Sequence, residues 1–211
     1  MRNYFKPGIS EQELWSRFQM EAVNRGAEWI ETRLLASGPR ANPWYQECSS
    51  RPIQAGELMG FDTDLVGSYG YCTDMSRTWL CGDEKPTNEQ KEIYTLGYEQ
   101  IQKNMELLKP GITFKELTLN AKEYSKDEFR HYSVLFHGVG LCDEFPAIPF
   151  SWELNENSFD GVLKKGMVMC VETYVGRFSG GSGVKLEEQV LITENGHELL
   201  TSYPFESDLL I

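Results

Sequence analysis

The size and charge of the chain exclude several classes of protein. With 211 residues, of which 40% are hydrophobic and 12% aromatic, we expect one domain spanning residues 1–211, with a core of ordinary size. Its 32 acidic and 20 basic residues give a formal net charge of −12, which repels phosphate backbones and anionic lipid surfaces. Neither a nucleic acid nor a membrane is therefore an expected partner.

The N-terminal segment and the cysteines predict a cytoplasmic protein. No stretch approaches the roughly 20 apolar residues of a membrane span, and the N-terminal residues lack the apolar core of a signal peptide. The five cysteines are odd in number and form no CxxC pair, which favours neither a disulfide framework nor a zinc site built from thiolates.

The first predicted element is a helix that begins after Pro7-Gly8. Ser10 is followed three residues later by Glu13, the capping-box arrangement that satisfies the first free amides of a helix. Apolar residues at helical spacing continue to about Ala36, which is where we expect the helix to end.

A turn and a strand are predicted over Gly56–Asp62, and three acids follow within a short stretch. Asp62 and Asp64 alternate with apolar residues, so a strand would carry both carboxylates on one face. Asp74 lies inside a second strand-like run. Neighbouring carboxylates raise one another's pKa unless a cation neutralises them, and a metal ion is the simplest such cation. Each Asp taken alone would instead be read as a turn former or as a partner of Arg77.

Two helices are predicted in the middle of the chain. The first covers about residues 88–108 and has one apolar face. The second begins at Thr113, which forms a capping box with Glu116, and continues to about Tyr124.

The second half of the chain repeats the plan of the first. The capped turns at Pro7 and Pro110 are 103 residues apart, and the strand that begins at Gly56 recurs 110 residues later at Gly166, where it ends at Glu172. A strand over residues 189–193, an Asn-Gly turn and a returning strand to residue 200 complete the chain. This repeat predicts a pseudo-symmetric α+β domain made of two halves.

The donors of the two halves together favour a metal site. Glu172 occupies the position equivalent to Asp62, Glu187 is another acid among strand-forming residues, and His137 supplies one nitrogen donor. A histidine beside a glycine can also be a purely structural hydrogen bonder. Carboxylates with one imidazole form a hard site suited to a pair of divalent ions such as Fe, Mn, Co or Zn.

This pattern resembles the metal site of the pita-bread superfamily, which comprises methionine aminopeptidases, proline-specific peptidases and creatinases. The resemblance rests on the two strand acids and on the segments HGVG, VET and VKLEEQV, and it covers nearly the whole chain. It implies a pita-bread fold with a pseudo-two-fold internal repeat. It also implies metal ligation by Asp62, Asp74, His137, Glu172 and Glu187, with Asp64 as an additional acid.

Two motifs differ from those of the peptidases. Where the peptidases carry a histidine in a Pro-His-Tyr-like segment, this chain has Trp44, and where they carry one in an HE-x-P motif, it has Asp143. Those histidines hold the substrate and assist peptide cleavage, so their replacement argues against peptide hydrolysis. The substituted segments, including Asp64, are instead similar to the P-type dimethylsulfoniopropionate lyases of the same superfamily.

The resemblance to the lyases implies a catalytic base and a substrate wall. Asp143 would act as the base of a β-elimination on a small carboxylated sulfonium compound such as dimethylsulfoniopropionate. Trp44, Tyr45 and Tyr132 are the expected substrate-binding residues, because a desolvated cation over an indole face gains about 2 kcal/mol. Ordinary core packing is the alternative for all three. Ser133 stands where we would expect a substrate-contacting histidine in the lyases, so the substrate could differ.

Other interpretations stay open at this point. The chain could be an Xaa-Pro dipeptidase-like or aminopeptidase-like metallohydrolase, or a catalytically silent binding module with the same shape. The longer lyases and peptidases carry an additional N-terminal domain, so either a second protomer covers the site or the chain is a fragment. We expect a homodimer, since a lone catalytic domain leaves its pocket open.

Overall fold

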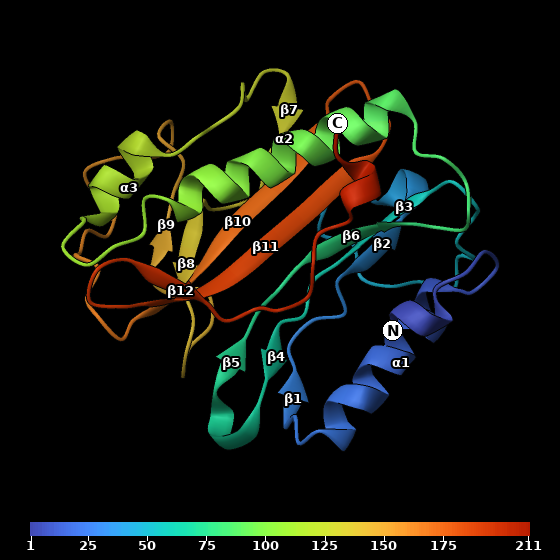
Figure 1. Ribbon diagram of the computed structural model, residues 1–211, viewed down its shortest axis with the longest axis horizontal. Helices are drawn as coiled ribbons and strands as arrows, with labels where there is room; N and C mark the ends of the chain where they lie inside the picture. Colours follow the sequence, from blue (N-terminus) through green and yellow to red (C-terminus); the bar gives the residue numbers. More distant parts are fainter.

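The computed structural model describes residues 1–211 and has the mixed helix and strand content expected of an α+β protein (Figure 1). The helices are α1 (Glu11–Asn24), α2 (Asn88–Met105) and α3 (Phe114–Asn120). The strands of the first half are β1 (Trp29–Ile30), β2 (Leu35–Ser37), β3 (Leu58–Phe61), β4 (Leu65–Val66), β5 (Cys72–Thr73) and β6 (Arg77–Leu80). Those of the second half are β7 (Phe129–Arg130), β8 (Phe136–Gly138), β9 (Ala147–Ile148), β10 (Val168–Arg177), β11 (Gly183–Ile192) and β12 (His197–Leu199). Short 3-10 turns cover Arg2–Tyr4, Gly38–Arg40, Ser68–Gly70 and Ser207–Leu209.

The largest sheet belongs to the second half and has the strand order β12-β11-β10-β8-β9, with β7 also pairing with β10. Helix α2 lies across one face of β10 and β11 (Figure 1). This face is apolar because alternate strand residues such as Val171, Val184 and Leu186 point toward the helix, where they join a core of 22 buried residues. The opposite face of the same strands is therefore free to carry polar side chains.

The first half forms a three-stranded sheet of order β2-β3-β6 and a smaller one of order β1-β4-β5, with α1 beside them (Figure 1). Strand β6 lies next to β11, since the backbone N–H of Lys185 donates to Thr78 Oγ1 at 3.0 Å and the Thr78 hydroxyl donates to the carbonyl of Lys185 at 2.8 Å. The two halves are thus joined along these strands.

The internal repeat is confirmed by matched backbone hydrogen bonds. Gly8 N–H donates to the carbonyl of Ile53. The equivalent bond in the second half runs from Gly111 N–H, 103 residues after Gly8, to the carbonyl of Leu163, 110 residues after Ile53. The bridge between Ser10 and Pro52 recurs between Thr113 and Val162. Both predicted capping boxes are present, at Ser10 and at Thr113. The two halves therefore share a local fold as well as a sequence pattern.

Two predicted helix ends were wrong, and each has a local cause. Helix α1 ends at Asn24 rather than near Ala36, because Gly26 takes a left-handed conformation (φ 93°) and Ala27 N–H bonds back to the carbonyl of Ala22. Helix α3 ends at Asn120 rather than near Tyr124, since the next residue is already extended. The helix expected over residues 88–108 is present as α2.

The predicted tail hairpin is present, although β11 begins earlier than expected, at Gly183. None of the helices combines the length and the apolar character that crossing a membrane requires.

Candidate metal centre

The polar face of the large sheet gathers several donor side chains by simple strand register. Glu172 on β10 lies directly opposite Glu187 on β11, and Cys170 on β10 lies opposite His137 on β8. Residues two apart on a strand share a face, so Cys170 lies on the same face as Glu172, and Lys185 lies on the same face as Glu187. Glu172 sits in the middle of a ten-residue strand, which corrects the prediction that it ends one.

The three aspartates come from the first half and reach the same place from non-strand backbone. Strand β3 ends at Phe61, so the prediction that Asp62 and Asp64 share a strand face was wrong. Asp64 takes a left-handed conformation (φ 34°) instead, and Asp74 lies in the connection between β5 and β6 rather than inside a strand. The backbone N–H of Asp74 is held by the side-chain oxygen of Gln189 at 2.9 Å.

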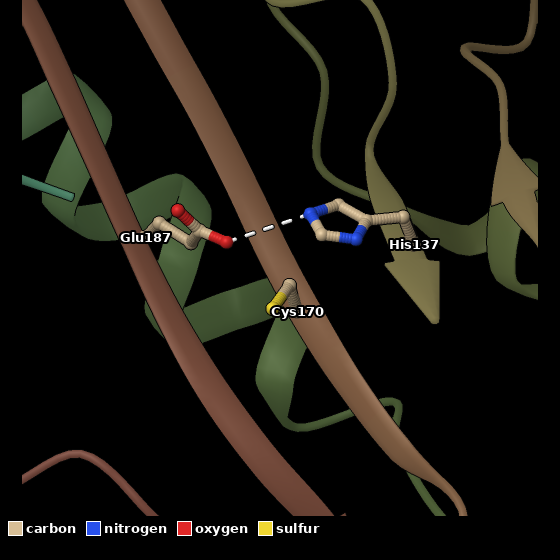
Figure 2. Close-up of side chains that lie close together, drawn as sticks. All are labelled: His137, Cys170 and Glu187. Atoms are coloured by element: carbon tan, nitrogen blue, oxygen red, sulfur yellow. Dashed lines mark ion pairs between the residues drawn. The ribbon is translucent and has the colours of Figure 1, made fainter. Parts of the chain in front are cut away.

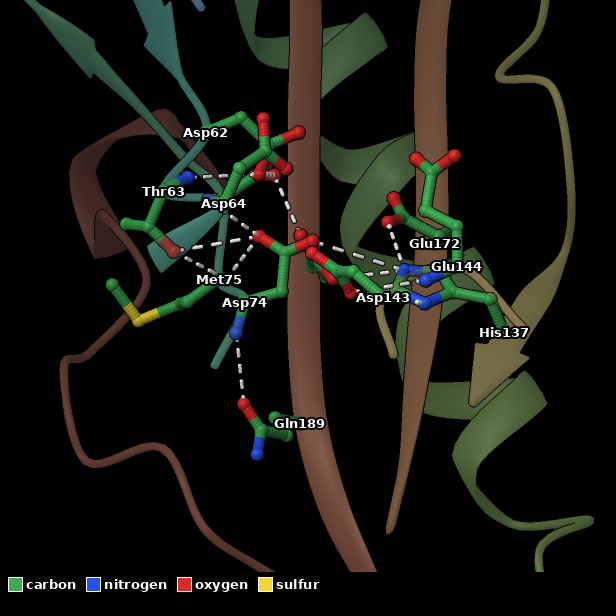
Figure 3. A network of polar contacts seen from close by, with 12 residues as sticks. Asp62, Thr63, Asp64, Asp74, Met75, His137, Asp143, Glu144, Glu172 and Gln189 are labelled. Carbon is green, nitrogen blue, oxygen red and sulfur yellow. Dashed lines mark hydrogen bonds and ion pairs between the residues drawn. The ribbon is translucent and has the colours of Figure 1, made fainter. Parts of the chain in front are cut away.

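The six predicted ligands come together in two overlapping, buried clusters. Figure 3 shows Asp62, Asp64, Asp74, His137 and Glu172 of this group. Carboxylate oxygens of Asp62, Asp64 and Asp74 lie within 4.8 Å of one another. The second cluster has the same spread and contains Asp74, His137, Glu172 and Glu187. Asp74 belongs to both, which is the arrangement that a carboxylate bridging two ions requires.

The orientation of His137 suits a metal ligand. Its Nε2 points into the cluster, 3.2 Å from Glu172 Oε1, 3.5 Å from Glu187 Oε1 and 3.9 Å from Asp74 Oδ2. Its Nδ1 lies 3.2 Å from the carbonyl oxygen of Gly138. With Nδ1–H donating to that carbonyl, the Nε2 lone pair would be available to an ion bound among the carboxylates.

Lys185 is a member of the site that sequence reasoning missed. This fully buried side chain places Nζ 2.6 Å from Glu172 Oε2, 2.6 Å from Ser76 Oγ and 3.0 Å from Asp62 Oδ2. It therefore links acids from both halves of the chain. The signal was available, because strand alternation from Glu187 puts Lys185 on the same face.

The charges of the site fit metal ions. Burial raises the pKa of Glu187 to about 7 and that of Asp64 to about 7, with repulsion from neighbouring acids adding to both. Two buried carboxylate oxygens, Asp62 Oδ2 and Glu187 Oε1, accept no hydrogen bond, although the ammonium of Lys185 lies near the first without hydrogen-bond geometry. When all five carboxylates are ionised, they and the ammonium of Lys185 together carry four negative charges, which two divalent cations would balance. The donor set thus matches the metal implied by the sequence.

Asp143 lies at the edge of these clusters, on the loop between β8 and β9. Its Oδ1 is 4.0 Å from His137 Nδ1, its side chain is only 7% exposed, and the backbone N–H of Glu144 donates to it at 3.0 Å. Burial raises the pKa of Asp143 to about 6, while the nearby imidazole opposes this shift. The carboxyl is therefore a stronger base than an ordinary Asp and still mostly ionised at pH 7.

The predicted substrate wall is divided between exposed and buried aromatic residues. Tyr132 is buried, donates to Glu144 Oε1 at 3.2 Å and stacks on Tyr45, which is 51% exposed. Trp44 is 6% exposed and packs on Tyr174 and against Gly60. The structure therefore brings Tyr45 and Tyr132 together, and buries Trp44 in a small apolar cluster with Tyr132 and Tyr174.

Two surface grooves lie outside these clusters. One groove of about 400 Å³ borders the β8–β9 loop and is lined by apolar side chains that include Tyr71, Leu141 and Phe145. Another, of about 380 Å³, lies beside α3.

Comparison with known proteins decides the family. The model of metallopeptidase family M24 matches residues 1–194. The chain belongs to this family. M24 enzymes depend on metal ions, and the clusters of acids and one histidine are where this member can hold them.

The M24 relatives that this chain resembles include proteins named as lyases and proteins named as peptidases. The chain is 49% identical over 202 residues to dimethylsulfoniopropionate lyase DddP of Roseovarius nubinhibens, and 48% identical over 201 residues to that of Roseobacter denitrificans. Each match covers 95% of this chain and 45% of the relative, so the chain spans less than half of their length. The solved prolidase from Pyrococcus horikoshii OT3 superposes with a TM-score of 0.82 at 31% identity, covering 97% of this chain and 57% of that one. The pita-bread fold expected from the sequence is confirmed.

Proposed function

We propose that the chain is a metal-dependent lyase that cleaves a small sulfonium carboxylate, such as dimethylsulfoniopropionate, by β-elimination. The observation that carries the proposal is the position of Asp143, a nearly buried carboxylate 4.0 Å from the imidazole of His137 at the edge of the acidic clusters. The identity to proteins named dimethylsulfoniopropionate lyase supports the same reaction.

In the proposed reaction, Asp143 removes the proton on the carbon next to the substrate carboxylate. The electron pair of that C–H bond forms the new C=C bond as the C–S bond to the neighbouring carbon breaks. Dimethyl sulfide then leaves with the C–S electron pair, acrylate remains, and Asp143 releases the proton to water. The backbone N–H of Glu144 holds Asp143 Oδ1 and so fixes the direction of the base.

We propose two divalent ions, of Fe, Mn, Co or Zn, held by Asp62, Asp64, Asp74, His137, Glu172 and Glu187. The overlapping clusters and their shared Asp74 support a pair rather than a single ion. Bound ions would supply positive charge that stabilises the substrate carboxylate as its neighbouring carbon loses a proton. Asp64, which also accepts a hydrogen bond from the Thr32 hydroxyl, is the most solvent-exposed of the six residues.

Tyr45, Tyr132 and Trp44 are proposed to bind the substrate. The exposed face of Tyr45 offers an aromatic surface for the sulfonium cation, while the stack on Tyr132 fixes its orientation. Buried Trp44 packs on Tyr174 and belongs to the same apolar cluster as Tyr132.

The direct test is incubation of metal-loaded protein with dimethylsulfoniopropionate, followed by NMR of the mixture. The proposal expects acrylate and dimethyl sulfide in equal amounts, at a rate proportional to enzyme concentration. Appearance of neither product with Fe-, Mn-, Co- or Zn-loaded protein would refute this substrate.

A second candidate is an Xaa-Pro dipeptidase-like hydrolase, favoured by the close superposition on a prolidase. It requires peptide cleavage without the two peptidase histidines. Hydrolysis of an Xaa-Pro dipeptide that is lost in His137→Ala would establish it in place of the lyase.

We further propose that the chain is a single domain, forms a homodimer and works in the cytoplasm. The exposed apolar side chains of Tyr71, Leu141 and Phe145 support a contact between copies, and five free cysteines suit a reducing compartment. Limited proteolysis, light scattering and cell fractionation test the three statements in turn.

A further inference from the structure

The side chain of Cys170 lies in the metal centre, although nothing in the proposed lyase reaction uses it. Strand register places it directly opposite His137 and two residues before Glu172 on the same face of β10. Donor atoms of Cys170, His137 and Glu187 all lie within 4.8 Å of one another, and all three side chains are fully buried (Figure 2).

A second observation at this cluster points to a ligand. Glu187 Oε1 is buried, faces the imidazole of His137 at 3.5 Å and accepts no hydrogen bond. An unpartnered carboxylate oxygen in the interior is costly, and a cation beside it removes that cost. Such a cation would have the thiol of Cys170 as a neighbour.

We propose that Cys170 supplies a sulfur donor to the ion held by His137 and Glu187, so that the two metal positions of the site differ in chemistry. The position bounded by Asp62, Asp64 and Asp74 offers only oxygen and suits hard ions such as Mn²⁺. The position beside His137 offers oxygen, nitrogen and sulfur, and suits thiophilic ions such as Zn²⁺ and Co²⁺. This inference rests on the proposed metal site but not on the lyase reaction.

The alternative is that Cys170 is a small apolar residue of the core. It packs with Cys72 and Val139 in a cluster of three buried side chains, as a free cysteine often does. Cys72 is the matched control, because it is buried in the same cluster and belongs to no group of donors.

The test is spectroscopic and uses the whole protein loaded with Co²⁺ or Zn²⁺. X-ray absorption of the wild-type protein should show a sulfur neighbour at about 2.3 Å from zinc. Sulfur-to-cobalt charge-transfer absorption should appear with Co²⁺, disappear in Cys170→Ala and Cys170→Ser, and persist in Cys72→Ala. Exposed Cys142 is replaced by serine in every sample, so that it cannot supply the signal.

Metal selectivity gives an independent readout. The preference for Zn²⁺ over Mn²⁺ should fall roughly tenfold in Cys170→Ser, which keeps the size of the side chain but replaces sulfur with a harder donor. Bound cobalt with ligand-field bands but no sulfur band would overturn the role of Cys170 and leave the metal site standing. Failure of the wild-type protein to bind any of these ions would overturn both.

Discussion

Lys185 and Asp62 come from opposite halves of the chain and meet in its interior, where Nζ lies 3.0 Å from Oδ2. The same ammonium is 2.6 Å from Glu172 Oε2. The ammonium of Lys185 thus contacts acids of both pseudo-symmetric halves, at the place where the strands β6 and β11 join these halves. Its charge lowers the repulsion that the buried acids would otherwise exert on one another.

Replacement of Lys185 by methionine should therefore destabilise the metal-free protein. Removing one partner of a buried ion pair costs about 3 kcal/mol or more, because the remaining charges stay buried. Urea unfolding in the presence of a chelator measures this loss. Lys103→Met, at an exposed lysine of α2, is the control and should change the free energy of unfolding by less than about 0.5 kcal/mol. Equal effects of the two substitutions would show that Lys185 does not hold the acids.

The free energy of unfolding of the metal-free protein should fall as pH rises, whereas a carboxylate paired with a cation would make it rise with pH. Glu187 and Asp64, with folded-state pKa values of about 7, keep protons that the unfolded chain releases near its ordinary values of 4.5 and 3.8. The free energy of unfolding should therefore fall as pH rises from about 4 to about 7. Urea titrations across this range measure it.

Two controls isolate the origin of that pH dependence. In the variant with both Asp64→Asn and Glu187→Gln the fall should be smaller, because two of the buried acids that gain charge are gone while Asp143 and Glu188, whose pKa values are also raised, remain. Saturation of the wild-type protein with Mn²⁺ should also suppress it, since the ions stabilise the ionised form. A fall of the same size in all three samples would contradict the assignment.

Two glycines of the HGVG segment should respond differently to alanine. A Cβ at Gly138 would lie 2.5 Å from the carbonyl oxygen of Phe145, so Gly138→Ala must displace the loop that carries Asp143. At Gly140 a Cβ would meet nothing within 4 Å. We expect Gly138→Ala to lower both metal affinity and melting temperature, and Gly140→Ala to leave both near the wild-type values. Calorimetry and metal titration compare the pair.

The capping boxes should contribute equally in the two halves. Ser10 Oγ accepts from the backbone N–H of Glu13 at 3.2 Å, and Thr113 Oγ1 accepts from that of Glu116 at 3.0 Å. Loss of such a cap costs about 1 kcal/mol, so Ser10→Ala and Thr113→Ala should each destabilise the protein by about that amount. Denaturant unfolding of both variants tests this, and an effect in only one half would show that the repeat is not energetically symmetric.

The sequence predicted the repeat, the starts of helices α1 and α3 and the gathering of six donor residues, because each leaves a local trace. Capping boxes and glycine turns are set by a few adjacent residues, and acids among strand formers such as Glu187 are unusual. The end of α1 was missed since the left-handed turn at Gly26 outweighed an apolar spacing that continued beyond it.

The members of the site that were missed look ordinary in sequence. Lys185 reads as a solvent-facing strand residue and Cys170 as a core residue. Lys185 is in the centre because it shares a face of β11 with Glu187, and Cys170 because it lies opposite His137. The approach of Asp62 to Lys185 joins distant segments, so no short pattern could indicate it. Strand alternation counted from each acid was the one signal available.

The most direct test of the proposed reaction is release of dimethyl sulfide by wild-type protein and by Asp143→Asn, each with its metal content measured. We expect sulfide from the wild-type protein, a loss of roughly 100-fold or more in Asp143→Asn at unchanged metal content, and no loss in Asp127→Asn, at an exposed acid. Full activity of Asp143→Asn, or no sulfide from metal-loaded wild-type protein, would contradict it.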